Sequence, residues 1–265
     1  MGKALELITG FVTAPSSTFT AWTLASGNSL TIRNAPLDKR ALLLQAWADN
    51  QVAGTMRIRS PRMHDNVQGI RLDIPVSDPC PLIPYNFPED IVPQDILVVE
   101  HTGSAVAGDI ETGCLLIWYE DLPGIDARLI DIPTLAKRKR RILTIENTLA
   151  LGTLGGYSGE EALNSEFDLL KANTQYALLG YLVDGECACV RWRGADTGNL
   201  GIGGPGNELL RFLTCNWFIR LTRELGIPLI PVFDSANKAA ILIDGAQDEN
   251  GTDITLTSIL AELAP

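Results

Sequence analysis

The sequence contains two copies of one pattern, and this internal duplication constrains the fold more than any other feature. Residues 28–59 (NSLTIRNAPLDKRALLLQAWADNQVAGTMRIR) align with residues 164–193 (NSEFDLLKANTQYALLGYLVDGECACVRWR) when two small gaps are allowed. Both segments begin with Asn-Ser, continue through two apolar runs and end with Arg-x-Arg. A repeat of this length indicates that one structural unit occurs twice. The chain of 265 residues is therefore predicted to form two units of similar architecture.

The same order of landmarks continues after the aligned segments. The matching pairs are Asn66 and Gly69-Ile70 with Asn199 and Gly201-Ile202, Pro81-Leu82-Ile83-Pro84 with Pro228-Leu229-Ile230-Pro231, Ile96-Leu97-Val98 with Ile241-Leu242-Ile243, and Asp109-Ile110-Glu111-Thr112 with Asp253-Ile254-Thr255-Leu256. The spacing between the copies grows after Gly201, which places extra residues near 207–221 in the second copy.

Each copy has the residue pattern of short β-strands. Apolar residues alternate with Arg57 and Arg59 in the first copy and with Arg191 and Arg193 in the second, which is the period of a strand with one buried face. The aspartate-led turns that precede these segments, at 48–51 and 183–186, predict hairpins. Further strands are expected at 96–100, 114–119, 239–244 and 254–259, and the 15 prolines and 24 glycines are spread between them. The predicted fold class is all-β with antiparallel sheets.

Two helices are expected within this β fold. Residues 208–225 carry Leu209, Leu213, Trp217 and Leu221 at four-residue spacing, and Gly226 followed by Pro228 supplies a stop signal. A less regular pattern predicts a second helix over 134–150. The predicted organisation is a first domain over 1–130, a basic connector over 131–150 and a second domain over 151–265 with the inserted helix near 208–225.

The charge is distributed unevenly. The net charge is −11, and five consecutive basic residues, Lys137, Arg138, Lys139, Arg140 and Arg141, leave −16 on the rest of the chain. This balance disfavours a surface that coats nucleic acid. A basic run of this kind is typical of a solvated helix face or linker, and contact with a membrane of anionic lipid or with a packaged genome is the alternative.

Nothing in the sequence indicates export or a membrane span. The first residues lack the pattern of a signal peptide, and the longest apolar runs are shorter than the roughly 20 residues that cross a bilayer. The five cysteines, Cys80, Cys114, Cys187, Cys189 and Cys215, are therefore expected to be reduced, with Cys187 and Cys189 on a core strand rather than in a metal site.

Other motifs favour structural roles over chemistry. Residues 201–206 (GIGGPG) match neither phosphate-loop pattern and predict a flexible loop before the helix. Residues 244–253 predict a solvated acidic loop, with Ca²⁺ binding as the alternative. His64 and His101, the only histidines, are expected in surface loops. We therefore predict no catalytic, cofactor-binding or metal-binding residues and no enzymatic activity.

Two tandem β units with a helix inserted late in the second resemble the double jelly-roll major capsid proteins of icosahedral viruses. The resemblance covers the whole chain and depends on segments 28–59 and 164–193 and on the two Pro-Leu-Ile-Pro strings. It implies two jelly-roll β-sandwiches and a homotrimer that forms a pseudo-hexameric capsomer, self-assembles with neighbouring capsomers and other virion proteins, and resides in the virion after synthesis in the host cytoplasm.

Two alternatives remain at this point, namely a two-domain β-sandwich protein that binds or processes carbohydrate, and a minor virion or tail component. The low aromatic content of 6% disfavours the first. For the capsid interpretation, we expect Arg57, Arg59, Arg191 and Arg193 to point outward and meet acidic patches on neighbouring subunits.

Overall fold

Four antiparallel sheets, arranged as two β-sandwiches, account for most of the chain. The computed structural model describes residues 2–25, 30, 32–33, 35–62, 67–74, 88–150, 155–157, 160–247 and 253–265. Every pair of neighbouring strands among these residues is antiparallel. The predicted all-β class is confirmed.

The first sandwich is built from residues before the middle of the chain. One sheet has the order β3 (Thr23–Leu24), β1 (Ala4–Thr13), β9 (Ile110–Tyr119), β4 (Ala41–Asp49), β7 (Glu89–Ile91). The facing sheet has the order β2 (Thr20–Ala21), β8 (Val98–Thr102), β5 (Gly54–Arg59), β6 (Ile70–Ile74).

The second sandwich follows in the chain. One sheet has the order β10 (Leu129–Ile130), β16 (Ile230–Asp234), β13 (Gln175–Asp184), β18 (Ile254–Leu263), β11 (Lys139–Leu149). The facing sheet has the order β12 (Glu161–Ala162), β17 (Leu242–Ala246), β14 (Glu186–Arg193), β15 (Ile202–Asn207).

The two sandwiches have the same topology. Strands β1, β9, β4 and β7 occupy the positions that β11, β18, β13 and β16 occupy in the second, and β2, β8, β5 and β6 correspond to β12, β17, β14 and β15. Eight strands divided in this way between two sheets form a jelly roll. The duplication seen in the sequence is therefore also a duplication of fold.

A β-bulge recurs at the same position in both copies. The register shifts between Leu43 and Gln45 where β4 pairs with β9, and between Leu178 and Gly180 where β13 pairs with β18. The same two strand pairs end on an aspartate opposite a threonine, as Asp49 with Thr112 and Asp184 with Thr255. Bulges are features of a fold that relatives keep, so these details fix the residue-by-residue correspondence of the copies.

The two predicted hairpins are wrong. The turn after Asp49 leads from β4 in one sheet to β5 in the facing sheet, and the turn after Asp184 leads from β13 to β14 in the same way. Short Asp- and Gly-containing turns are typical of hairpins but equally allow the chain to cross between sheets. Long-range pairing with β9 and β18 decides the outcome, because each strand finds its partners far away in the sequence.

The helical predictions need correction. The segment 131–150 is not a connector, because it forms helix α1 (Ile132–Arg138) followed by β11, and the predicted helix over 134–150 is limited to its first residues. The predicted helix over 208–225 is divided into a 3-10 turn (Glu208–Leu210), α2 (Arg211–Thr214) and α3 (Trp217–Leu225), and Gly226 ends α3 in the left-handed conformation with φ 68°. Two further 3-10 helices cover Ala195–Thr197 and Ser235–Ala240.

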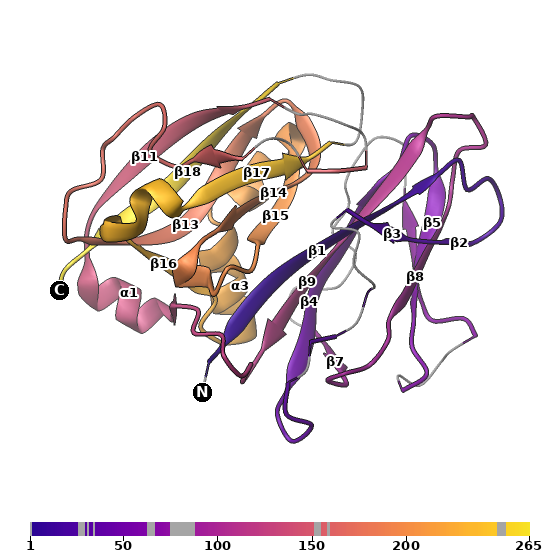
Figure 1. Cartoon of the computed structure of the whole chain (residues 1–265), viewed down its shortest axis with the longest axis horizontal. Helices are drawn as coiled ribbons and strands as arrows, with labels where there is room; N and C mark the ends of the chain where they lie inside the picture. Colours follow the sequence, from indigo (N-terminus) through magenta and orange to yellow (C-terminus); the bar gives the residue numbers. More distant parts are fainter. Residues whose placement is uncertain are drawn as a thin grey trace.

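The four sheets form successive layers (Figure 1). From the C-terminal side these are the sheet with β11 and β18, the sheet with β14 and β17, the sheet with β1 and β9, and the sheet with β5 and β8. Each sandwich has a hydrophobic interior, and the second interior is continuous with the contact between the sandwiches. Helix α3 buries Trp217, Phe218 and Leu221 and packs against β13 and β16.

Candidate functional site

The contact between the two sandwiches brings together residues that are distant in the sequence. On the side of the first sandwich it is apolar and comprises Leu5, Leu7, Leu42, Leu44, Trp47, Cys114, Leu116 and Trp118. These side chains lie on the outer face of β1, β9 and β4 and cluster with buried residues of the second sandwich. The central sheet is therefore buried on both faces.

Direct bonds fix the position of one sandwich against the other. The Trp47 indole donates a hydrogen bond of 2.9 Å to the Ala188 carbonyl, and its ring meets Trp217 edge-on at 6.2 Å between centroids. The Leu7 backbone N–H donates to the Gly201 carbonyl at 2.8 Å. These contacts connect β1 and β4 to β14, to the residue before β15, and to α3.

A small polar cluster lies within this apolar contact. The Thr9 hydroxyl lies 3.5 Å from the Cys114 sulfur and 3.3 Å from the Cys189 sulfur, and it accepts a hydrogen bond of 2.7 Å from Tyr157. Burial raises the pKa of the Cys114 thiol well above its ordinary value. The expectation that Cys187 and Cys189 lie on a core strand is confirmed, since both are fully buried in β14.

Arg191 connects the contact to the second sandwich. Its guanidinium donates two hydrogen bonds to Asp244, at 2.6 and 2.7 Å, and lies 3.3 Å from the centroid of the Tyr157 ring. Bidentate pairing and stacking on an aromatic ring both suit the planar guanidinium. The Tyr157 hydroxyl then bonds to Thr9 across the contact, so the arginine holds the aromatic ring that the first sandwich binds.

The first sandwich contains the same arrangement on its outward side. Arg57 stacks at 3.8 Å on the Phe19 ring and donates to Glu100 at 2.5 Å, while Arg59 donates to Glu100 at 2.9 and 2.8 Å. Arg57 lies directly opposite Glu100 across two strands, and Arg191 lies directly opposite Asp244 in the same way. We call Phe19, Arg57, Arg59, Arg71 and Glu100 the outward arginine cluster.

The charges of this cluster are held in place by pairing. Burial acts to raise the pKa of Glu100, but hydrogen bonds from Arg59 and Arg57 outweigh it and lower the pKa. The carboxylate thus stays ionised at neutral pH. Arg71 lies 5.5 Å from the Phe19 ring and is exposed, so the cluster presents a positive group beyond the pairs with Glu100.

These pairs revise the prediction for the two Arg-x-Arg motifs. Arg191 and Arg193 do not point away from the chain. Arg191 lies at the contact with the first sandwich, and Arg193 forms an ion pair with Glu160. Arg57 and Arg59 do lie on an outward sheet, but Glu100 of the same chain already pairs with both.

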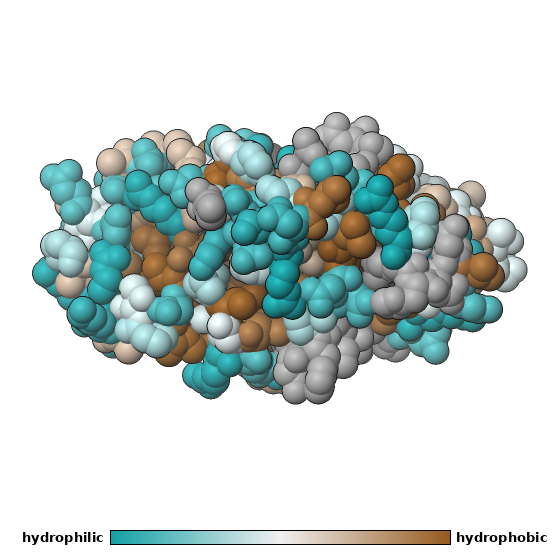
Figure 2. All heavy atoms as spheres, turned by 90° about the horizontal axis from the view of Figure 1, so that it is seen from below, coloured by the Kyte–Doolittle hydropathy of each residue, from teal (hydrophilic) through white to brown (hydrophobic). Residues whose placement is uncertain are grey.

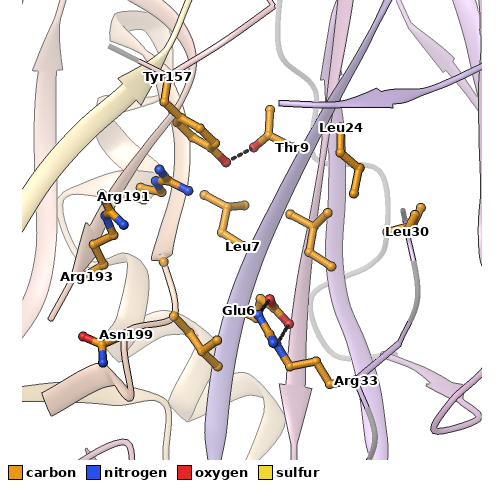
Figure 3. Close-up of a pocket in the computed structure, with 13 residues that line it drawn as sticks. Glu6, Leu7, Thr9, Leu24, Leu30, Arg33, Tyr157, Arg191, Arg193 and Asn199 are labelled. Atoms are coloured by element: carbon orange, nitrogen blue, oxygen red, sulfur yellow. Dashed lines mark hydrogen bonds and ion pairs between the residues drawn. The ribbon is translucent and has the colours of Figure 1, made fainter. Parts of the chain in front are cut away.

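A cavity of about 430 Å³ opens where β1 meets the turn before β15 (Figure 3). Arg33 donates to both oxygens of Glu6, at 2.8 and 2.5 Å, and Tyr119 donates to the same carboxylate at 3.2 Å. Tyr157 and Thr9 bond on the opposite wall. The cavity is lined by residues of both sandwiches, so it lies at the boundary between them. The charged residues Glu6 and Arg33 in its wall are paired with each other.

His101 lies in the core and not in a surface loop as predicted. It is fully buried in β8 beside Trp22, with 5.8 Å between ring centroids, and neither ring nitrogen has a hydrogen-bond partner among the described residues. Burial lowers its pKa to about 3, so the imidazole is neutral. His64 and Cys80 lie outside the described residues, so those predictions stay open.

Two loop predictions have different outcomes. The flexible loop predicted over 201–206 is wrong, because its residues from Ile202 onward belong to the buried strand β15, where small glycines allow Tyr181 and Trp217 to approach Gly204. The acidic segment 244–253 begins in β17 with Asp244 bound to Arg191, and residues 248–252 lie outside the described residues. Within the described ranges, no group of three or more potential ligand residues is placed to hold a metal ion.

The basic run is divided between two elements. Lys137 and Arg138 end α1, and Lys139, Arg140 and Arg141 begin β11. Arg138 donates to the Ala264 carbonyl and to Gln175, and Arg141 donates to Glu262. Lys137, Lys139 and Arg140 are exposed. Within the described residues, no helix is both long and apolar enough to span a bilayer.

No known protein family matches the sequence, and no curated protein is similar to it. Several solved structures show low similarity to the fold, and two of them follow. The PBSX exported protein XepA is 9% identical with a TM-score of 0.30, and the alignment covers 97% of this chain and 86% of that chain. A chain in the atomic structure of Sulfolobus Turreted Icosahedral Virus is 9% identical with a TM-score of 0.22, covering 100% of this chain and 91% of that chain. Similarity at this level carries no argument about function.

Proposed function

We propose that this chain is a structural, non-enzymatic coat protein that self-assembles into the capsid of a virus. Its building block is a homotrimer in which three chains place six jelly rolls in a ring, as a pseudo-hexamer. The protein is made in the host cytoplasm and resides in the virion. The exposed residues Lys137, Lys139 and Arg140 are available to an anionic partner, such as a membrane or the packaged genome.

The observation that carries this proposal is which face of each jelly roll forms the contact between them. The outer face of the β1–β9–β4 sheet meets the outer face of the β14–β15 sheet, so two different faces are joined. At the two ends of the molecule, the corresponding face of the β5–β6–β8 sheet and the β11–β18 part of the other face remain outward (Figure 1). A contact between unlike faces is heterologous, and such contacts close into rings when the rotation at each step is suitable.

The tryptophans favour this proposal over carbohydrate binding. Carbohydrate sites commonly use exposed aromatic rings, whereas Trp47, Trp192 and Trp217 are fully buried and Trp118 is 4% exposed. These rings stabilise the interior and the contact between the sandwiches. They are not available as a binding platform.

The oligomeric state tests the proposal. The purified chain is expected to elute as a trimer of 28.7 kDa subunits in size-exclusion chromatography with light scattering, and electron microscopy is expected to show hexagonal capsomers or shells. A chain that stays monomeric at all concentrations and salt conditions would contradict the coat-protein function.

A further inference from the structure

We propose that the outward arginine cluster of one copy binds the outward face of β11 and β18 of a second copy, with Glu146 placed against the arginines. This inference rests on the proposed coat function and names the surfaces that join the chains. The partner of each face is thus another copy of this chain. The contact between the two copies repeats the arrangement of the contact between the two sandwiches within one chain.

The correspondence of the two sandwiches identifies the residues that would meet. At the contact within the chain, Thr9 on β1 faces Tyr157 and Cys189, and Thr9 pairs with Cys114 of β9. Counting from the shared bulge and Asp–Thr pair, the position of Cys114 belongs to Thr257 in the second copy, and Thr257 pairs with Glu146. Glu146 therefore stands on β11 where Thr9 stands on β1.

The same correspondence describes the part of the face that β11 and β18 form. Leu5 and Leu7 of β1 correspond to Ile142 and Thr144 of β11, and Leu116 of β9 corresponds to Ile259 of β18. Burial alternates along most of β11, and Thr144, Glu146 and Thr148 are exposed, whereas β1 is buried on both faces over most of its length. Ile142 is 55% exposed, which is unusual for an apolar side chain in a strand.

The outward arginine cluster also differs in charge from the surface that occupies its place at the contact within the chain. Phe19, Arg57 and Glu100 take the places of Tyr157, Arg191 and Asp244. Arg71 pairs with Arg57 across β5 and β6, while Gly203 pairs with Arg191 across β14 and β15. An arginine therefore projects where the contact within the chain has only a glycine. Asp73, two residues along β6, is also exposed on this face and accepts a hydrogen bond from Thr55. The face still carries a net positive charge, because Arg57 and Arg59 share the single acid Glu100, whereas Arg191 and Arg193 each have an acid of their own. The opposite face gains Glu146, so the two faces match in charge.

This exchange gives the contact between chains a different character from the contact within the chain. The internal contact is apolar and permanent, because it completes a hydrophobic core. The contact between copies depends on exposed charges, which salt screens over a distance of about 10 Å at 0.1 M. Assembly through these faces is therefore reversible and weakens as the salt concentration rises.

A charge exchange tests the pairing in the full-length chain. Glu146→Arg and Arg71→Glu should each lower the association constant at least about tenfold at low salt, because each places like charges together. The double variant E146R/R71E should recover most of the loss. Sedimentation velocity across a range of concentrations measures the association, and circular dichroism verifies the fold of each variant.

Asp38→Arg is the matched control, since Asp38 is an exposed aspartate in the loop before β4 and its substitution makes the same change of charge. This control should associate like the wild type. If the wild type forms trimers and E146R associates equally well, the trimer uses other faces, and this inference fails while the coat function stands. If single variants weaken association but the double variant does not recover, the direct pairing of Glu146 with Arg71 is wrong. A wild type that never associates would contradict both proposals.

Discussion

At the residue scale, the two sandwiches share one arrangement of an arginine, an aromatic ring and an acid, but the residues around it differ. An arginine stacked on an aromatic ring and paired with an acid across two strands occurs as Arg57 with Phe19 and Glu100, and as Arg191 with Tyr157 and Asp244. Only the second is placed at a contact within the chain, where the tyrosine hydroxyl reaches Thr9. Phe19 lacks that hydroxyl, which suits a ring that supports an arginine on an outward surface.

His101 gives the residue-scale prediction. The unfolded chain takes up a proton at this histidine below its ordinary pKa of 6.5, whereas the folded protein does so only near pH 3. The free energy of unfolding should therefore fall as the pH drops from 6.5 towards 3, by up to about 1.4 kcal/mol per pH unit from this group.

His101→Leu removes the buried ring nitrogens, so the variant should lose less stability than the wild type over this pH range. Urea unfolding at pH 7, 6, 5 and 4 measures the difference. Parallel curves for the two proteins would mean that His101 titrates normally and is not buried as described.

At the element scale, β4 and β11 lie at different positions of corresponding sheets and have different surroundings. Every residue of β4 is buried, and its sequence ALLLQAWAD is almost continuously apolar. The sequence of β11, KRRILTIENTL, alternates in burial after its basic start. Strands buried on both faces read as continuous apolar runs, while strands with one solvated face alternate. The two sequences thus indicate that β4 is covered on both faces and that β11 is covered on one.

Trp47 on β4 tests this double burial. Trp47→Ala should lower the free energy of unfolding by about 3–5 kcal/mol, because it leaves a large cavity and an unpaired Ala188 carbonyl between the sandwiches. Trp47→Phe should cost less, since most of the buried area remains. Differential scanning calorimetry measures both.

Leu43→Ala is the control for position, because Leu43 lies on the same strand but points into the first interior. It should also destabilise the protein while leaving a single unfolding transition. Trp47→Ala should instead separate the transitions of the two sandwiches. A cost below about 1 kcal/mol for Trp47→Ala, the range of surface substitutions, would show that the contact is not tightly packed.

At the scale of the whole molecule, the two sandwiches depend on each other unequally. Leu122 and Ile125 belong to the first interior, and Arg128 pairs with Asp196 and Asp234 of the second sandwich. The natural division of the chain therefore falls near residue 126. Separation there would expose the apolar outer face of β1, β9 and β4, and a large exposed apolar patch promotes aggregation.

We predict that fragment 1–126 is insoluble when it is expressed alone and soluble when it is co-expressed with fragment 127–265. Co-purification with a tag on one fragment measures the association. The combination carrying Trp47→Ala serves as the control and should co-purify less. A soluble, monomeric fragment 1–126 would show that its outer face does not require the second sandwich.

The sequence by itself determined the duplication, the β class and the approximate strands. The alternation of apolar and polar residues is a local signal, and the landmarks recur in the same order in both copies. It indicated the helix near 208–225 and the core position of Cys187 and Cys189. It did not determine that the turns after Asp49 and Asp184 cross between sheets, that residues 139–149 extend as β11, or that His101 is buried. Those outcomes depend on pairing with β9 and β18, whose residues are distant in the sequence. Only the tertiary structure decided which arginine motif faces the partner sandwich and which faces outward. The sheet that carries Arg191 packs against the first sandwich, whereas the equivalent sheet that carries Arg57 lies at the outer end of the molecule.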